Sequence, residues 1–144
     1  MNRLSWAVAV MVGLAGGSVA AAPAATARPA CTHLSGRVGT LRTDDGGRTV
    51  CAHRGQEIDV VLVVDPVEGT VPEQWWHPVD LTGTALTAMP MTLMAIRGTT
   101  LARYRVRAHG RATLSSERHP CVPPPPGGVS CDTIESWSVT VLVR

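Results

Sequence analysis

The chain has 144 residues, of which 44% are hydrophobic and 17% are charged, so it can fill the core of one ordinary domain but is too short for a large multidomain enzyme. The same composition excludes a disordered chain. The formal net charge is only +2, and no cluster of arginines is interleaved with aromatic residues, so we expect no nucleic-acid partner.

The first residues have the pattern of an export signal. Arg3 gives a positive start, an apolar run begins at Leu4, and the alanine-rich stretch that follows ends in small residues. This pattern predicts a signal peptide over residues 1–27 that is removed, with a retained membrane anchor as the alternative. No later segment is apolar for long enough to cross a bilayer. We therefore expect a secreted, extracellular protein with no membrane contact after signal cleavage.

The region after the signal divides into a short leader and a main domain. Residues 28–47 are interpreted as an Ala/Pro linker and one extra N-terminal strand within 31–43, ending in the turn Asp44-Asp45-Gly46-Gly47. Residues 48–144 are the predicted main domain.

Four cysteines, an even number, lie in the exported part of the chain. In an oxidising compartment this indicates two disulfides, for which three connectivities exist. Cys121 and Cys131 flank a segment rich in Pro and Gly, so a bridge between them would close that loop at its base. We predict this pairing, together with a bond between Cys31 and Cys51 that ties the leader to the first core strand.

The main domain has the residue pattern of an all-β protein. Aromatic residues are only 3% of the chain, and branched aliphatic residues, which favour strands, must supply the core. Alternation and turn signals predict an immunoglobulin-like antiparallel β-sandwich of about seven strands. The strands are predicted at 48–53, 57–64, 75–79, 86–96 with an interruption at Pro90, 100–108, 111–117 and 136–144.

Alternation also predicts which side chains face the core. In residues 100–108, for example, Tyr104 and Val106 lie on one face, and Arg103, Arg105 and Arg107 lie on the other. The predicted inward set consists of Val50, Ile58, Val60, Leu62, Val64, Tyr104, Val106, Leu114, Trp137, Val139 and Val141.

Three short segments lie next to predicted strands: the first follows the strand at 57–64, the second precedes the strand at 100–108, and the third follows the strand at 111–117. The first is Asp65-Pro66-Val67-Glu68-Gly69-Thr70, the second is Arg97-Gly98-Thr99-Thr100, and the third is Arg118-His119-Pro120 followed by Cys121. From residue 48 onward, this arrangement resembles the chagasin-type cysteine protease inhibitors. In that family three loops with the patterns Asn-Pro-Thr-Thr-Gly-Tyr, Gly-x-Gly-Gly and Arg-Pro-Trp enter the cleft of a papain-like protease.

The resemblance implies a set of partner-binding residues in the three candidate segments. Pro66 and Gly69 match the first family pattern in spacing, whereas the Thr pair of that pattern and the Trp of the third are absent here. The implied partner-binding residues are Asp65, Pro66, Gly69, Thr70, Arg97, Gly98, Thr99, Arg118, His119 and Pro120.

Two other features suggest different binding functions. Trp75-Trp76-His77 would form an aromatic platform if it were exposed, or place one Trp in the core if it were not. The run from Met89 to Met94 contains thioethers that suit Cu(I), but methionine also fills irregular cores, and we interpret the run as core.

Catalytic and metal-binding motifs are absent from the sequence. There is no Gly-x-Ser-x-Gly elbow, no phosphate-binding glycine loop before a helix, and no His-x-His or His-Glu-x-x-His spacing. We therefore expect a non-enzymatic binding module without cofactor or metal. Its predicted function is inhibition of a papain-family protease by loop occlusion, and the alternative is an extracytoplasmic ligand-binding or cell-envelope interaction domain.

Overall fold

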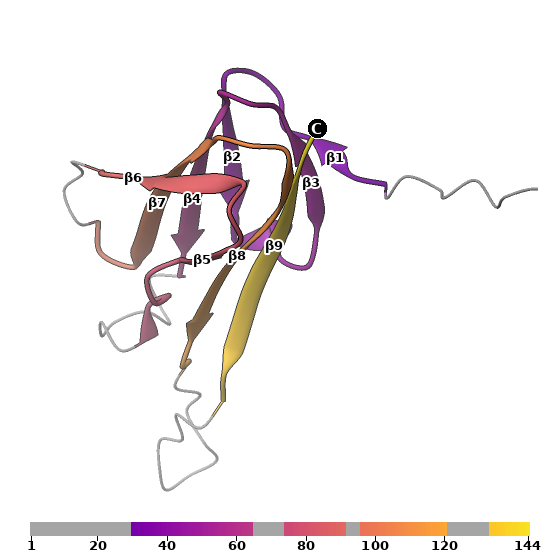
Figure 1. Cartoon of the computed structure of the whole chain (residues 1–144). Coiled ribbons are helices and arrows are strands. Elements are labelled where there is room, and N and C mark those ends of the chain that lie inside the picture. The colour runs from indigo at the N-terminus through magenta and orange to yellow at the C-terminus, as the bar shows by residue number, and fades with distance from the viewer. Residues whose placement is uncertain (1–29, 65–73, 92–95, 121–132) are drawn as a thin grey trace, which may run out of the picture.

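Two β-sheets packed face to face make up the protein (Figure 1). A computed structural model describes residues 30–64, 74–91, 96–120 and 133–144, and the predicted signal peptide lies outside these residues. The described part contains nine strands and one short 3-10 helix, η1 (Thr43–Asp45). The strands are β1 (Thr32–His33), β2 (Val38–Arg42), β3 (Thr49–Ala52), β4 (Glu57–Val63), β5 (Asp80–Thr82), β6 (Leu86–Met89), β7 (Thr99–Val106), β8 (Gly110–Arg118) and β9 (Glu135–Val143).

The strand order confirms the predicted all-β, immunoglobulin-like sandwich. The first sheet has the order β1-β3-β9-β8-β5, and the second has the order β2-β4-β7-β6. Both sheets are mixed rather than purely antiparallel, because β1 pairs with β3, β3 with β9, and β2 with β4 in parallel. None of these pairs is joined by a tight hairpin, which would force an antiparallel arrangement.

Three segments differ from their predicted strands. The strand predicted over 86–96 is shorter, since β6 ends at Met89, before Pro90, and residues 92–95 lie outside the described part of the chain. The leader forms two strands, β1 and β2, which join different sheets. The predicted strand at 75–79 is wrong, since the strand in this region is β5, which begins at Asp80. Pro78 has no N–H for a ladder, and the carbonyl oxygen of His77 accepts a hydrogen bond from the Ser116 side chain instead of a strand neighbour.

The core lies between the sheets and is mainly aliphatic. Every residue of the predicted inward set is buried, with at most 3% of its surface exposed. Residues 57–63 show why the alternation was informative: Ile58, Val60 and Leu62 are fully buried, whereas Val63 is 51% exposed. The leader adds Leu41 from β2 to this core.

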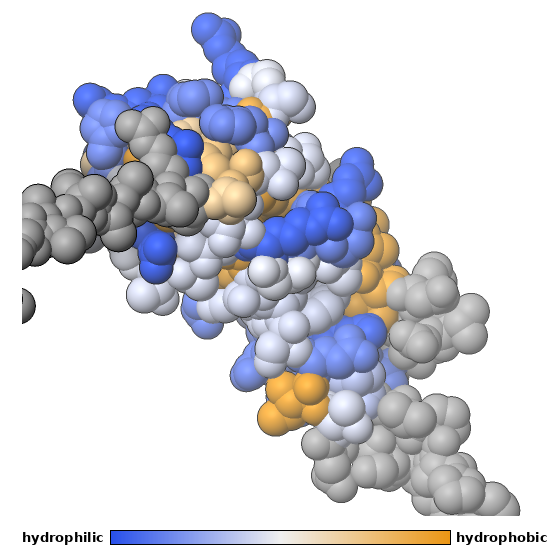
Figure 2. All heavy atoms as spheres, turned by 90° about the vertical axis from the view of Figure 1, so that its right-hand side faces the viewer, coloured by the Kyte–Doolittle hydropathy of each residue, from blue (hydrophilic) through white to orange (hydrophobic). Residues whose placement is uncertain are grey.

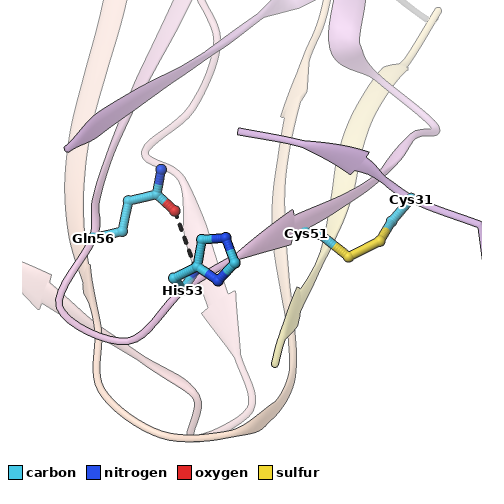
Figure 3. Close-up of a disulfide and its surroundings, with 4 residues drawn as sticks. All are labelled: Cys31, Cys51, His53 and Gln56. Carbon is cyan, nitrogen blue, oxygen red and sulfur yellow. Dashed lines mark hydrogen bonds between the residues drawn. A yellow bond between two sulfur atoms is a disulfide. The ribbon is translucent and has the colours of Figure 1, made fainter. Parts of the chain in front are cut away.

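A disulfide and a buried glutamine attach the leader to the sandwich (Figure 3). Cys31 is bonded to Cys51, which confirms this part of the predicted pairing. The Gln56 side chain accepts a hydrogen bond from the His53 backbone N–H and donates to the carbonyl oxygens of Leu34 and Gly36. Cys121 and Cys131 lie outside the described residues, so their bond stays a prediction.

The outer faces of the sheets are polar in different ways. On the second sheet, Arg103 makes a two-bond contact with Asp59 at 2.6 and 2.8 Å, and Arg105 contacts Glu57 at 2.8 Å. The hydrogen bonds that Arg103 donates to the Asp59 carboxylate, and the negative charge of that carboxylate, raise the pKa of Arg103 above its usual value. Figure 2 shows the opposite side of the molecule, where hydrophobic surface is confined to separate patches.

We expect the buried and exposed valines of β4 to differ strongly in their contribution to stability. Val60→Ala should lower the free energy of unfolding by about 2–3 kcal/mol, because it removes buried methyl groups and leaves a cavity. Val63→Ala is the matched control on the same strand and should cost less than about 1 kcal/mol. Urea unfolding of both variants tests this. Equal losses would contradict the assigned faces of β4.

Candidate functional site

The ends of three strands meet at one end of the sandwich. In the second sheet, Val63 at the end of β4 pairs with Thr99 at the start of β7. The Val64 N–H donates to the Gly98 carbonyl oxygen at 2.9 Å, so the chain leaves β4 toward the first candidate segment directly beside the second. β8 of the first sheet ends at this same end of the molecule, in the lower part of Figure 1.

Trp76 connects the second candidate segment to the third. Its carbonyl oxygen accepts a hydrogen bond from the Thr100 hydroxyl of β7. Its ring lies below the guanidinium of Arg118, the last residue of β8, at 5.4 Å from the ring centroid. Trp76 is only 6% exposed and therefore contacts both sheets from within. Trp76 therefore contacts two of the three candidate segments, the second through its backbone carbonyl and the third through its ring.

Arg118 is held on both sides. Its Nε atom donates to the Glu135 carboxylate at 2.6 Å, and the side chain is only 12% exposed. Arg118 and Glu135 are also cross-strand partners at the ends of β8 and β9. A charged hydrogen bond combined with stacking on an indole fixes the guanidinium plane. These contacts join the end of β8 to the start of β9, the two strands that flank residues 119–134.

The start of the third candidate segment continues along the same surface. His119 and Pro120 are half-buried, and the His119 ring lies 5.6 Å from the ring of His77. The His77 N–H donates to the Glu117 carbonyl oxygen at 2.9 Å, and its Nδ1 atom lies 3.9 Å from the Glu117 carboxylate. A backbone hydrogen bond therefore places His77 at the end of β8, where its ring lies beside that of His119.

The second candidate segment requires a glycine. Arg97 is exposed, Thr99 is half-buried, and Gly98 between them is buried with a φ of +70°. This left-handed conformation is unfavourable for residues with a Cβ atom. Gly98 therefore sets the backbone direction at which the segment enters β7.

The structure brings together part of the predicted set. Arg97, Gly98, Thr99, Arg118, His119 and Pro120 lie on the second and third segments at the shared end. Asp65, Pro66, Gly69 and Thr70 lie outside the described residues.

Sequence reasoning missed the role of Trp76 and of Glu135. The alternative in which both tryptophans form an exposed platform is wrong for Trp76, which is buried, while Trp75 is half-buried. The pairing of Trp76 with Arg118 joins residues more than forty positions apart, and no local pattern reveals it. In the described part of the chain, no group of three or more His, Cys, Asp or Glu side chains is placed to hold a metal ion.

Comparison with known proteins gives structural likenesses only. No family model and no curated protein matches the chain. It is similar to the crystal structure of the cysteine protease inhibitor EhICP2 from Entamoeba histolytica, with 13% identity, a TM-score of 0.49, and coverage of 81% of this chain and 100% of that one. It is also similar to the solution structure of amebosin, with 14% identity, a TM-score of 0.43, and coverage of 76% and 100%.

Tyr104 anchors the segment that carries Trp76. Its hydroxyl donates to the Val79 carbonyl oxygen at 2.9 Å, and the residue is 2% exposed. Burial, and secondarily the charge of Asp80, raise the pKa of Tyr104 above its usual value of 10.0.

We expect this pKa to be measurable directly, because Tyr104 is the only tyrosine in the chain. Ultraviolet titration of the native protein should give a midpoint above that of the urea-unfolded protein. Since the folded pKa is the higher one, Tyr104 stabilises the fold fully below pH about 10, and this contribution is lost as the pH rises through the folded pKa. Tyr104→Phe should remove that part of the alkaline destabilisation. Coincident native and unfolded midpoints would contradict the assignment.

Proposed function

We propose that the protein is a secreted, non-enzymatic inhibitor of papain-family cysteine proteases. The first, second and third candidate segments would enter the protease cleft together and block it without being cleaved. The observation that carries this proposal is the meeting of the β4, β7 and β8 ends, with Trp76 fastened to both Thr100 and Arg118.

Preorganisation supports a role in occlusion. A loop that is already held in its bound conformation loses less entropy on association, and rigid scaffolds commonly present binding loops in this way. Here the second segment is held by the contact between Val64 and Gly98, and the third begins at an arginine fixed by Glu135. Both contacts hold backbone that the resemblance assigns to the protease contact.

An extracellular location agrees with the covalent structure. The Cys31–Cys51 disulfide is of the kind that persists in oxidising compartments. Among the described residues, no helix has the length and apolar character needed to cross a bilayer. The disulfide and the predicted signal peptide over residues 1–27 support secretion.

Inhibition of papain by the mature domain, residues 28–144, tests the proposal. Gly98→Ala should raise the inhibition constant about 5- to 30-fold, because the free segment relaxes out of the left-handed conformation and returning to it on binding costs roughly 1–2 kcal/mol. The strain displaces the backbone of the second segment while the core packing is retained.

Gly55→Ala is the matched control. Gly55 has a φ of +82° and open space around its Cβ position, and it precedes β4 at the opposite end of the sandwich. It should lower stability comparably and leave the inhibition constant unchanged. Equal weakening by both variants, or no inhibition by the unaltered domain against several papain-like proteases at high micromolar concentration, would overturn the proposal.

A further inference from the structure

The outer face of the first sheet carries hydroxyl side chains in register across its strands. Thr113 of β8 pairs with Thr82 of β5 on one side and with Thr140 of β9 on the other, and Thr140 pairs in turn with Thr49 of β3. Four threonines therefore form one row across four strands. The adjacent row is Asp80, Ser115 and Ser138, and the next is Glu117 and Ser136.

These side chains point away from the core. Along β8 and β9 they alternate with buried residues such as Leu114 and Val139. Figure 2, which views the molecule from the side of β3 and β9, shows a broad pale area across the middle, the colour of residues with intermediate hydropathy such as Ser and Thr. We call this surface, formed by the three rows, the hydroxyl face.

A hollow of about 290 Å³ opens on the hydroxyl face beside β5. Its size is near the lower end of the range for small-ligand pockets. The lining includes the side chains that matter for recognition, namely His77, Asp80, Ser115, Glu117, Ser136 and Ser138.

Several polar groups around the hollow are not used by the fold. Within the described part of the chain, the hydroxyls of Ser115, Ser136 and Ser138 and the carboxylate of Asp80 make no hydrogen bond or ion pair. Ser116 provides the contrast, since it is buried and donates to the His77 carbonyl oxygen at 2.7 Å. The hydroxyl of Ser116 is thus used within the fold, whereas the hydroxyls of Ser115, Ser136 and Ser138 remain available to a ligand.

We propose that the hydroxyl face binds a neutral saccharide chain, with one sugar ring seated in the hollow. A serine or threonine hydroxyl both donates and accepts hydrogen bonds, as a sugar hydroxyl does, and a carboxylate accepts from sugar hydroxyls. Strand spacings of about 4.8 Å across and 6.6 Å along the sheet place these groups at intervals within reach of neighbouring sugar hydroxyls. The row of threonines extends the contact beyond the hollow.

The charges on this face disfavour other ligand classes. Asp80 and Glu117 would repel a phosphate, a sulfate or an acidic sugar. A metal ion would need a cluster of ligating side chains, and the described residues contain no such group. His77 and Glu117 of the hollow adjoin the third candidate segment, but the serine and threonine rows that carry this inference lie outside the three segments, so it does not rest on the proposed protease inhibition.

Backbone-amide NMR titration of the mature domain tests the proposal. The probes are neutral hexasaccharides of glucose, mannose and N-acetylglucosamine, an acidic hexasaccharide of galacturonic acid, and the cationic hexasaccharide of glucosamine. At least one neutral probe, at millimolar concentration, should shift amides of 113–117 and 136–140, and the shifts should persist in high salt. The acidic probe should cause no shift.

Ser115→Val combined with Ser138→Val should weaken that binding at least about tenfold, because it removes a cross-strand hydroxyl pair from the hollow while retaining residues that suit strands. Thr40→Val on β2, exposed on the outer face of the second sheet, is the matched control and should bind like the unaltered domain. Papain inhibition by the double variant should be unchanged, which separates the two proposals.

Two results would overturn the saccharide site. One is the absence of shifts on the hydroxyl face with every neutral probe. The other is binding of the glucosamine probe alone that salt removes, since this would show attraction of a cation by Asp80 and Glu117 instead of recognition of hydroxyls.

Discussion

Trp137 and Tyr104 join the two sheets through hydrogen bonds that cross the aliphatic core. The Trp137 indole N–H, on β9 of the first sheet, donates to the Arg42 carbonyl oxygen of β2 in the second sheet at 3.0 Å. The hydrogen bond of Tyr104 crosses in the other direction, because its hydroxyl, on β7 of the second sheet, donates to the carbonyl oxygen of Val79 just before β5 of the first sheet. A buried polar atom without a partner costs about 1–3 kcal/mol, so each aromatic residue requires the opposite sheet in one position. The turn after β2 has a glycine where the Trp137 ring packs. A Cβ atom at Gly46 would lie only 3.0 Å from that ring.

The local part of this architecture was predictable from sequence, and the long-range part was not. Alternation over 57–64 and 136–144 predicted which residues of β4 and β9 are buried, because a strand with one wet face repeats every two residues. The parallel pairing of β3 with β9 brings together residues about ninety positions apart, and neither strand carries a local signal for its neighbour. The same limit explains the error at 75–79, where Trp76 is held by contacts from β7 and β8 and not by a ladder of its own.

The candidate site shows the same division between what is local and what is not. Gly98 was identifiable from sequence as part of the second segment, and its positive φ gives a physical reason for glycine at that position. Glu135 was not, because its function depends on Arg118, which lies across the long connection from β8 to β9. The residues that would touch a partner are therefore partly visible in the sequence, whereas the residues that hold them are visible only in the folded chain.

The outer faces of the two sheets differ in the kind of recognition that they allow. On the second sheet, the charges of Arg103 and Arg105 are matched at close range by the carboxylates of Asp59 and Glu57. On the first sheet, the row of threonines carries no charge, Asp80 and Glu117 lie in the rows on one side of it, and Arg111 lies beyond it on the other side. A partner of the first sheet must be recognised by hydrogen bonds of matching spacing, because neither a long-range field nor a broad apolar surface is available there. Hydroxyl groups in register across four strands supply such a spacing only while the strands keep their pairing, so the bonds of Trp137 and Tyr104 that fix the sheets also fix this face.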